Sequence, residues 1–597
     1  MRRHFLLLLT MLILGLIPSE TEGQDLLGDT LPLTNTFLHL KPYVDLSGQG
    51  KLISMTTQPA STGNTNLFVT TQSGKVFSVE DTGNATGSAS LWFDYDSAIQ
   101  SIIPNANNGF VLDSVTNPHG GLRAIAFHPD FANNGKFYTS AMVDRPTGIT
   151  GLNYLGSSVS GFDAESVVVE WTVDPLTGQL AANPYRELFR VQMPVFDHPV
   201  KQIAFNPYAQ PGDEDYGLLY VAHGDGSVHS AIAGGGQNRD DALGKILRIN
   251  PLADGSQPYT TPGNPFVGDP NTLDEIYTLG HRNPHHISFA QVAPGQTVAI
   301  VAEAGRDNIE EINVLIPGGD YGWSDREGTF IHNKNGGPNG LGYGLDYGVS
   351  ALPANDWQLN DYIYPAAQYD HDAPLGASAV GIAVAGGFVI DNHSDPELQN
   401  KYIFADFPSR TGWVFMADLN DLINAHTQLA DGELPDALTQ APISRLRVSM
   451  DSNGDGNIDF TSNNLNTLLG VSRNDVRFGK GPNGEMFLSS KATGQVYLVT
   501  NTVPPLIGDL NGDGFVGLVD LGIILNRWNQ NVTPGQWSLG DPSGDGFVGI
   551  DDLNEVLGNW NAGIPPSDSA NIPEPTSAAL ILLGTLGPLT RRGGYRH

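Results

Sequence analysis

Between about residues 35 and 500 the chain repeats one simple unit, in which two short strands flank a turn rich in Gly, Pro and Asn. Strand pairs separated by such turn signals are typical of an all-β fold. Six units can be identified, in NLFVTTQSGKVFSV (66–79), LRAIAFHPDFANNGKFYTSAMV (122–143), KQIAFNPYAQPGDEDYGLLYVAHGD (201–225), ISFAQVAPGQTVAIVAEAG (287–305), GFVIDNHSDPELQNKYIFADF (387–407) and VRFGKGPNGEMFLSSKATGQVYLV (476–499). Irregular insertions between the units argue against a strict repeat array. The pattern predicts a mainly β chain whose residues 35–503 form a six-bladed β-propeller with long loops.

The charge balance limits the classes of partner. The chain has 30 Lys and Arg residues against 64 Asp and Glu residues, which gives a net charge of −34. This surplus repels a phosphate backbone, so nucleic acid is not expected as a partner. The same surplus suits calcium, which binds through oxygen ligands. Because the chain has no cysteine, disulfides cannot stabilise it, and packing or metal ions must do so.

The N-terminus has the layout of a secretory signal. Arg2, Arg3 and His4 precede an apolar run from Phe5 to Ile17, and Pro18 opens a polar stretch. The apolar run is too short to span a bilayer comfortably. Residues 1–23 are therefore predicted to be a signal peptide, and the protein is predicted to be exported to the periplasm, the cell surface or the extracellular space.

A tandem repeat follows the strand-rich region. DLNGDGFVGLVDLGIILNRWN begins at Asp509 and DPSGDGFVGIDDLNEVLGNWN at Asp541, so the spacing is 541 − 509 = 32 residues. In each copy oxygen-bearing residues occupy positions 1, 3, 5 and 12 of a calcium loop, and Gly at position 6 permits the sharp turn. The predicted ligands are Asp509, Asn511, Asp513, Asp520, Asp541, Ser543, Asp545 and Asp552. An amphipathic helix is expected after each loop, so residues 504–563 should form a small α-helical module.

These paired loops resemble the dockerin module, whose calcium loops end in Asp rather than in the Glu of ordinary EF-hands. The resemblance leaves two readings open. The module either only folds around calcium and stabilises the end of the chain, or it also docks onto a cohesin-like or cell-surface partner.

A third loop, DSNGDGNID, lies within the strand-rich region. It places Asp451, Asn453, Asp455 and Asp459 at positions 1, 3, 5 and 9, but position 12 is Ser462. Without the closing carboxylate it is either a weaker calcium site or a plain Asp/Asn/Gly turn.

The C-terminal segment, residues 564–597, contains Pro-Glu-Pro, an apolar stretch from Ala578 to Leu589, and Arg591 and Arg592. It resembles the PEP-CTERM sorting tail, which implies processing by a sorting protease of the exosortase type. A short apolar stop before a basic cluster would hold the chain in the membrane while it is cut. The alternative is a permanent anchor, which the short and broken apolar run disfavours.

Four further motifs occur in a fixed order: GLRAIAFHPDF (121–131), LGKILRINP (243–251), YTLGHRNP (277–284) and EINVLIPGGDYGW (311–323). Together they resemble the soluble glucose/sorbosone dehydrogenases that depend on pyrroloquinoline quinone (PQQ). The resemblance implies a six-bladed propeller, PQQ and Ca²⁺ as cofactors, oxidation of an aldose-type sugar at its anomeric carbon, and an electron acceptor that the sequence does not name.

The resemblance also implies roles for single residues. His198 would be the general base, because a neutral imidazole can accept the proton of a sugar hydroxyl, and Asp225 would orient it. Backbone carbonyls of Gly305 and Arg306 would hold calcium. The cofactor contacts would be Arg282, Asn283, Arg410, Arg473, Arg477 and His119. Fixed cations suit a cofactor with three carboxylates.

Two departures from the family pattern motivate an alternative function. Pro199, Val200 and Lys201 replace the small residues that commonly follow the base, and His119 stands where the family has Gln or Glu. The alternative is a catalytically inactive propeller that binds polysaccharide or protein at the cell surface. The histidines of HRNPHH are expected to close a strand-end turn rather than to bind zinc, because no acid completes a ligand set.

Overall fold

In the computed structural model the described residues are 26–27, 31–83, 86–103, 110–112, 120–145, 150–156, 164–194, 197–226, 236–252, 257–306, 308–333, 349–371, 383–391, 393, 395–406, 412–454, 458–500, 506–563 and 565. The chain divides into two compact units, Met1–Val503 and Pro504–His597. The predicted signal peptide, and all of the predicted sorting tail except Pro565, lie outside the described residues. No helix within the described ranges is long and apolar enough to cross a membrane.

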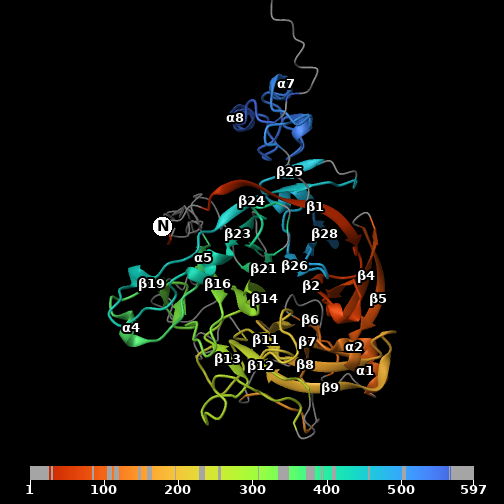
Figure 1. The fold of residues 1–597 in the computed structure, drawn as a ribbon, viewed down its shortest axis with the longest axis vertical. Coiled ribbons are helices and arrows are strands. Elements are labelled where there is room, and N and C mark those ends of the chain that lie inside the picture. Colours follow the sequence, from red (N-terminus) through yellow and green to blue (C-terminus); the bar gives the residue numbers. More distant parts are fainter. Residues whose placement is uncertain are drawn as a thin grey trace, which may run out of the picture. The chain divides into compact units, whose positions relative to one another are not determined.

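Four separate four-stranded sheets make up most of the first unit (Figure 1). The first contains β2 (Leu52–Thr57), β3 (Leu67–Thr71), β4 (Lys75–Gly83) and β5 (Thr86–Asp94). The second contains β6 (Gly121–Phe127), β7 (Lys136–Asp144), β8 (Ala164–Val173) and β9 (Leu180–Gln192). The third contains β10 (Val200–Phe205), β11 (Leu219–His223), β12 (Lys245–Ile249) and β13 (Ile276–Leu279). The fourth contains β14 (Pro284–Ala293), β15 (Gln296–Glu303), β16 (Ile309–Val314) and β20 (Ala367–Asp370).

A nine-stranded sheet supplies two more groups of four strands. One is β21 (Val384–Ile390), β22 (Lys401–Asp406), β23 (Val414–Asp418) and β24 (Ser444–Met450). The other is β26 (Val476–Lys480), β27 (Met486–Ser490), β28 (Gln495–Val499) and β1 (Leu33–Asp45). The N-terminal strand β1 pairs antiparallel with β28 and parallel with β24, which joins the two groups. β25 (Phe460–Ser462) pairs with β24.

The first strand of each group faces a common centre. β2, β6, β10, β14, β21 and β26 contact one another in that order, and β26 contacts β2 again. Figure 1 shows these strands arranged around the middle of the unit. The prediction of a mainly β chain is confirmed, and each of the six predicted strand pairs is present as paired strands.

Alternating side chains on a middle strand of each group explain the packing. Successive residues of a strand point to opposite faces, so one apolar residue packs toward the preceding group and its neighbour toward the next. The buried pairs are Phe68 and Val69, Phe137 and Tyr138, Tyr220 and Val221, Ile300 and Val301, Tyr402 and Ile403, and Phe487 and Leu488. Each pair divides between two hydrophobic clusters, and the six clusters follow one another around the centre. This core fixes the inner ends of the strands.

Shorter elements lie between the strands, both within the groups and from one group to the next. A three-stranded sheet contains β17 (Arg326–Glu327), β18 (Phe330–His332) and β19 (Val349–Ala351). Among the described residues of the first unit, the helices are α1 (Tyr95–Ile102), α2 (Phe131–Asn134), α4 (Asp356–Leu359), α5 (Leu419–Asn424) and α6 (Leu465–Leu469), with 3-10 turns at Ala60–Thr62 and Pro435–Ala437.

Within residues 506–563, the second unit has two helices of equal length and a 3-10 turn. They are α7 (Leu518–Asn526), α8 (Ile550–Gly558) and Trp537–Leu539. Val516, Ile524, Val548 and Val556 are fully buried between the two halves. Asn529 and Asn561 both have positive φ, of 62° and 64°, and lie 561 − 529 = 32 residues apart, which matches the sequence repeat.

Candidate functional site

His198 and Asp225 form a buried pair at the inner end of the third strand group. His198 directly precedes β10, and Asp225 follows β11, which pairs with β10. The Nδ1 atom of His198 lies 2.6 Å from Oδ1 of Asp225, and the two residues are 4% and 0% exposed. A carboxylate on Nδ1 fixes the ring orientation and favours the tautomer with its lone pair on Nε2. Asp225 therefore holds the ring through Nδ1, while Nε2 faces the carboxylate of Asp197 at 3.4 Å.

The local backbone is shaped to bring this pair together. His198 adopts φ = 46°, in the left-handed region that non-glycine residues rarely occupy. Such a conformation costs about 1–3 kcal/mol and is found mostly at functional sites. Gly224 makes the approach possible, because a Cβ there would lie 2.7 Å from Cβ of His198. The close contact with His198 thus requires a glycine at position 224, the first of the two in AHGDG.

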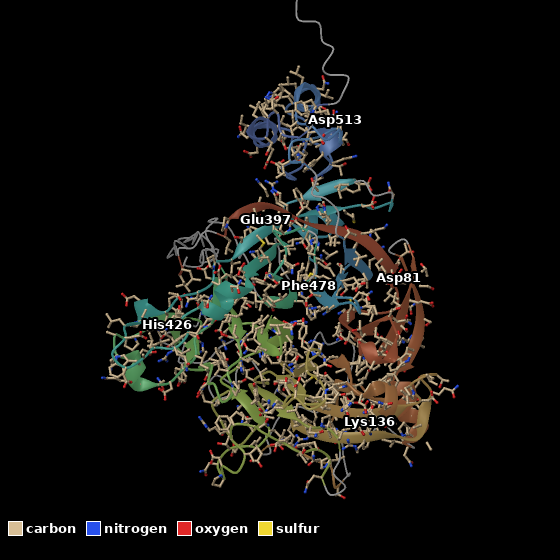
Figure 2. All side chains as sticks on the ribbon, viewed as in Figure 1. Asp81, Lys136, Glu397, His426, Phe478 and Asp513 are labelled. Atoms are coloured by element: carbon tan, nitrogen blue, oxygen red, sulfur yellow. The ribbon has the colours of Figure 1, made fainter. Side chains whose placement is uncertain are left out.

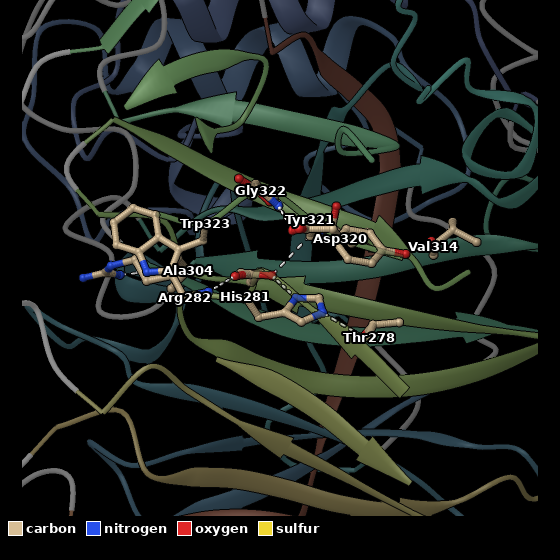
Figure 3. A network of polar contacts seen from close by, with 12 residues as sticks. Thr278, His281, Arg282, Ala304, Val314, Asp320, Tyr321, Gly322 and Trp323 are labelled. Atoms are coloured by element: carbon tan, nitrogen blue, oxygen red, sulfur yellow. Dashed lines mark hydrogen bonds and ion pairs between the residues drawn. The ribbon is translucent and has the colours of Figure 1, made fainter. Parts of the chain in front are cut away.

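Trp323 and Arg282 extend the pair into a network. The Trp323 indole N–H donates to Oδ2 of Asp225 at 2.9 Å, and the Asp225 backbone N–H donates to the Arg282 carbonyl at 2.7 Å. The Arg282 guanidinium lies over the Trp323 ring, with Cζ 5.6 Å from the ring centroid, and the two residues are seen together in Figure 3. Its Nη1 donates to the carbonyls of Ala304, at 3.0 Å, and Gly305.

His281 has a structural role, as the sequence predicted for it. Its Nδ1 lies 2.7 Å from Oε2 of Glu303, and its Nε2 lies 2.8 Å from Oγ1 of Thr278 (Figure 3). The ring is completely buried. His285 and His286 lie further along β14 and line the hollow that is described next.

A small hollow opens on the axis of the first unit. Strands from five of the six groups line it: β2, β6, β10, β14 and β26. The lining residues are Ile53, Ser54, Met55, Arg123, Lys201, Gln202, His285, His286, Arg477 and Phe478. Phe478 lies near the middle of the unit in Figure 2. Three of these ten side chains are basic and none is acidic, in a chain whose acidic residues outnumber basic ones by 64 to 30.

Burial lowers the pKa of the basic side chains in the hollow. Burial, and then the charge of Arg123, lowers the pKa of Lys201 to about 7 and that of Arg477 to about 9. Burial lowers the pKa of Arg123 to about 10 and that of His286 to about 3. Desolvation and mutual repulsion both disfavour the charged forms, so a bound anion would stabilise them. The hollow is therefore suited to an anionic ligand.

Asp197 links the hollow to the pair. Its Oδ2 lies 3.4 Å from Nε2 of His198, and its charge acts on both Lys201 and Arg123. The sequence did not single out Asp197, and it did not assign Arg123 to the site. Arg123 was hidden in an apolar strand pattern, where alternation places it on the axial face of β6.

The remaining predicted contacts fall into three classes. Asn283 is buried, its carbonyl accepts a hydrogen bond from Ala304 N–H at 3.1 Å, and its Oδ1 has no hydrogen-bond partner within the described part of the chain. Arg473 is not in the hollow, because its side chain is 58% exposed and pairs with Asp475 at 2.8 Å. The structure therefore does not bring Arg473 to the hollow with Arg477, because Arg473 lies on the segment before β26 and Arg477 lies on the strand itself. His119 and Arg410 lie outside the described residues.

One of the two predicted calcium carbonyls, that of Gly305, already accepts a hydrogen bond. The Gly305 carbonyl accepts from Arg282, and the Arg306 N–H donates to Oε1 of Glu327 at 2.7 Å. The guanidinium therefore provides a positive charge where the prediction placed calcium.

Buried carboxylates lie behind this segment and make stability depend on pH. Burial, with the nearby charge of Glu303, raises the pKa of Glu311 from its ordinary 4.5 to about 8. The folded protein thus retains a proton that the unfolded chain has lost between those values, so stability falls as pH rises from 4.5 to 8. We expect Glu311→Gln, which stays neutral and can still accept from Gly328 N–H, to be more stable than the parent above pH 8 by about 1 kcal/mol or more. Urea denaturation at pH 4 and pH 8.5 checks this, and an equal difference at both values would contradict it.

The three predicted calcium loops differ in their geometry. Asp541, Asp545 and Asp552 each offer a carboxylate oxygen, and these oxygens lie within 4.8 Å of one another. In the first loop Asp509 accepts from Gly512 N–H at 2.8 Å and Gly514 N–H at 2.7 Å, and Asp520 accepts from Leu510 N–H at 2.7 Å. In the third loop, Asp451 accepts from Gly454 N–H at 2.7 Å, Asp459 accepts from Ser452, and Asp455 lies outside the described residues.

Comparison with known proteins identifies relatives of the chain. The glucose/sorbosone dehydrogenase family profile matches residues 53–336. The chain is 27% identical over 399 residues to the HIPL1 protein of Arabidopsis thaliana, which covers 61% of the chain and 52% of that protein. It is 29% identical over 300 residues to quinoprotein glucose dehydrogenase B of Acinetobacter calcoaceticus, and this match covers 48% of the chain and 53% of that protein. It is 30% identical over 340 residues to an uncharacterized protein of Synechocystis sp., which covers 56% and 69%. The chain thus spans about half the length of the first two relatives.

Proposed function

Because the chain belongs to the glucose/sorbosone dehydrogenase family, we propose that it is a PQQ-dependent enzyme that oxidises an aldose-type sugar at the anomeric carbon. The single observation that carries the proposal is the juxtaposition of the His198–Asp225 pair with a buried, basic hollow. The pair supplies a proton acceptor, and the hollow supplies the charge that an anionic cofactor needs. We also propose that the six strand groups are the six blades of a β-propeller.

The donor chemistry of the site fits PQQ. The cofactor is a flat quinone with three carboxylates, and Arg477 offers a buried guanidinium at the hollow while Arg282 presents one beside Trp323. The Nε of Arg282 and the Oδ1 of Asn283 are buried and have no hydrogen-bond partner among the described residues, so they can serve a ligand. Arg410 remains a predicted contact. When bound, the quinone supplies the hydride acceptor, and calcium would polarise it.

The chain's own residues would act on the substrate as follows. Nε2 of His198 accepts the proton of the anomeric hydroxyl while Asp225 stabilises the resulting imidazolium through Nδ1. The Trp323 indole N–H holds the second oxygen of Asp225, so that the carboxylate cannot rotate away. Trp323 is thus a positioning residue.

A reconstitution assay tests the proposal. PQQ and calcium are added to the purified chain, and reduction of an artificial dye is measured with a panel of aldoses. Dye reduction that depends on sugar and on PQQ is expected, together with quinone absorbance that stays with the protein on gel filtration. Loss of the quinone on gel filtration would favour the alternative, a binding protein without catalysis, for which the Lys201 side chain in the hollow is the motivating observation.

Asp225→Asn should show whether Asp225 acts by orienting the His198 ring, because the substitution keeps the size of the side chain and should leave the protein folded. Asn keeps the shape but offers only one acceptor oxygen, so it cannot accept from both His198 and Trp323. We expect kcat to fall by about 10²-fold or more while the protein still retains PQQ. Trp323→Phe removes the indole donor, keeps an aromatic ring beside Arg282 and leaves both oxygens of Asp225, so it should lower kcat less. Equal kcat for Asp225→Asn and the parent would contradict the role of Asp225.

The remaining parts of the chain receive proposals of their own. We propose that the module of residues 504–563 is dockerin-like and binds two calcium ions, and that it attaches the enzyme to a cohesin-like or cell-surface partner. Residues 1–23 would direct export, and an exosortase-type protease would process residues 564–597. The electron acceptor is left unassigned.

A further inference from the structure

Two of the buried bases share an acidic neighbour, Asp197, with the Nε2 atom of His198. Lys201 is only three positions after His198, on the same segment, and Arg123 lies on the neighbouring inner strand β6. Asp197 contacts Nε2 of His198 at 3.4 Å and acts electrostatically on both bases. Lys201 and Arg123 are 6% and 3% exposed and line one hollow. Asp197 therefore links the charges of Lys201 and Arg123 to the Nε2 atom of His198, where the reacting hydroxyl must bind if His198 is to accept its proton.

With Arg477 assigned to the anionic cofactor, Lys201 and Arg123 still give the hollow more positive charge than a neutral sugar requires. A neutral aldose is recognised by hydrogen bonds that polar uncharged side chains can supply, and burying a base for this purpose costs desolvation energy. Gln202 is such a side chain in the same lining, but its Oε1 already accepts from Ile287 N–H at 2.8 Å. A carboxylate on the substrate would offset the cost for Lys201 and Arg123, since charge-assisted hydrogen bonds are the strongest available.

We propose that the substrate is an acidic sugar, a hexuronic acid whose carboxylate binds Lys201 and Arg123. This inference rests on the proposed sugar dehydrogenase function and narrows its substrate class. The guanidinium of Arg123 offers a planar fork that fits a carboxylate, and the ammonium of Lys201 adds a point charge. Arg477, on β26, stays with the anionic cofactor.

The reaction balances without any further reactant. The C1–H bond of the ring form breaks, and its hydride passes to the quinone cofactor with both electrons. The proton of the C1 hydroxyl passes to Nε2 of His198, and C1 becomes the carbonyl carbon of a lactone. The carboxylate at C6 is unchanged, so the product is a lactone of the corresponding aldaric acid. The dye then takes the two electrons from the reduced cofactor.

Matched sugar pairs test the proposal on the full chain. Galacturonate is compared with galactose, and glucuronate with glucose, because the members of each pair differ only at C6. We expect kcat/KM to favour each uronate by about 10-fold or more, the effect of one charge-assisted contact. Calorimetric titration of the same sugars into cofactor-free protein should show the same preference in Kd.

Variants identify the residues that set the preference. Lys201→Gln and Arg123→Leu should bring the ratio of kcat/KM for the uronate to kcat/KM for the matched hexose toward one. Lys201→Arg should keep most of the preference for the uronate. Lys51→Gln, a change at an exposed lysine, serves as the control and should leave the ratio as it is in the parent.

The outcomes distinguish this inference from the function on which it rests. Oxidation of neutral hexoses at equal or higher kcat/KM would overturn the inference and leave the dehydrogenase standing. If no sugar reduces the dye, the dehydrogenase proposal fails, and the calorimetric comparison then decides alone. Equal Kd values for uronate and hexose would overturn the inference, and a preference lost in Lys201→Gln would support it.

Discussion

Replacing His198 by Gln is expected to lower kcat by about 10³-fold, within the range by which a positioned general base accelerates proton transfer. The side chain of Gln can fill much of the same space and donate to Asp225, but its amide cannot take up a proton near neutral pH. The measurement is sugar-dependent dye reduction by the PQQ-loaded chain. Quinone absorbance after gel filtration reports separately whether the variant still binds the cofactor.

A matched histidine gives the control for this substitution. His426 lies in a surface ion pair with Glu433, and its side chain is 42% exposed. His426→Gln should therefore keep parental kcat. If His198→Gln retains kcat within twofold of the parent while it binds PQQ, another group takes the proton, and the role of His198 is wrong. A parallel loss in both variants would instead indicate a general effect of histidine replacement.

Calcium removal is expected to unfold the second unit and to leave the first unit folded. Asp509, Asp520, Asp541 and Asp552 are all at most 7% exposed, so their charges repel one another across a small core. Burial raises the pKa of both Asp509 and Asp552, which shows that their charged forms are disfavoured without a cation. Each bound ion should stabilise the fold by about 2.7 kcal/mol when free calcium is 100-fold above Kd.

Thermal unfolding of the full chain with calcium or with a chelator measures this effect. One transition should move to lower temperature with chelator, and calorimetric titration should find two strong sites in this module. Asp552→Ala should remove one of these sites, because its carboxylate lies within 4.8 Å of those of Asp541 and Asp545. The adjacent and exposed Asp551 provides the control, since Asp551→Ala should keep both sites. Unchanged unfolding in chelator would contradict the calcium proposal.

Much of the fold could be predicted from sequence because its signals are local. The strand pairs carry turn residues and alternating apolar positions, and both are visible in single segments such as 66–79 and 476–499. The inner strand β2 was not identified, because LISMTT carries neither strict alternation nor a turn of its own. The pairing of β1 with β28 and β24 could not be read either, since it joins segments from opposite ends of the first unit.

Some residues of the candidate site could also be predicted from local motifs, whereas others come together only in the folded chain. The pairing of His198 with Asp225 followed from the resemblance of short motifs, and the structure places them in hydrogen-bond contact. The proximity of Arg123, Lys201 and Arg477 depends on three strands meeting at the axis, which no local pattern encodes. Arg473 and Arg477 are close in sequence, yet one is exposed and the other buried. The motif resemblance therefore predicted the contact between His198 and Asp225, but no pattern in the sequence predicted the cationic lining.

The N-terminal strand β1 closes the circle of strand groups by pairing with strands from the other end of the first unit. β1 starts at Leu33 and fastens onto β28, which ends at Val499, so the circle closes only after 499 − 33 = 466 residues are available. Such distant pairing makes completion slow, because the chain entropy must be lost before the contact forms. Until then the six strand groups lack the contact that closes their circle, and pulling β1 away from β28 would open the circle again.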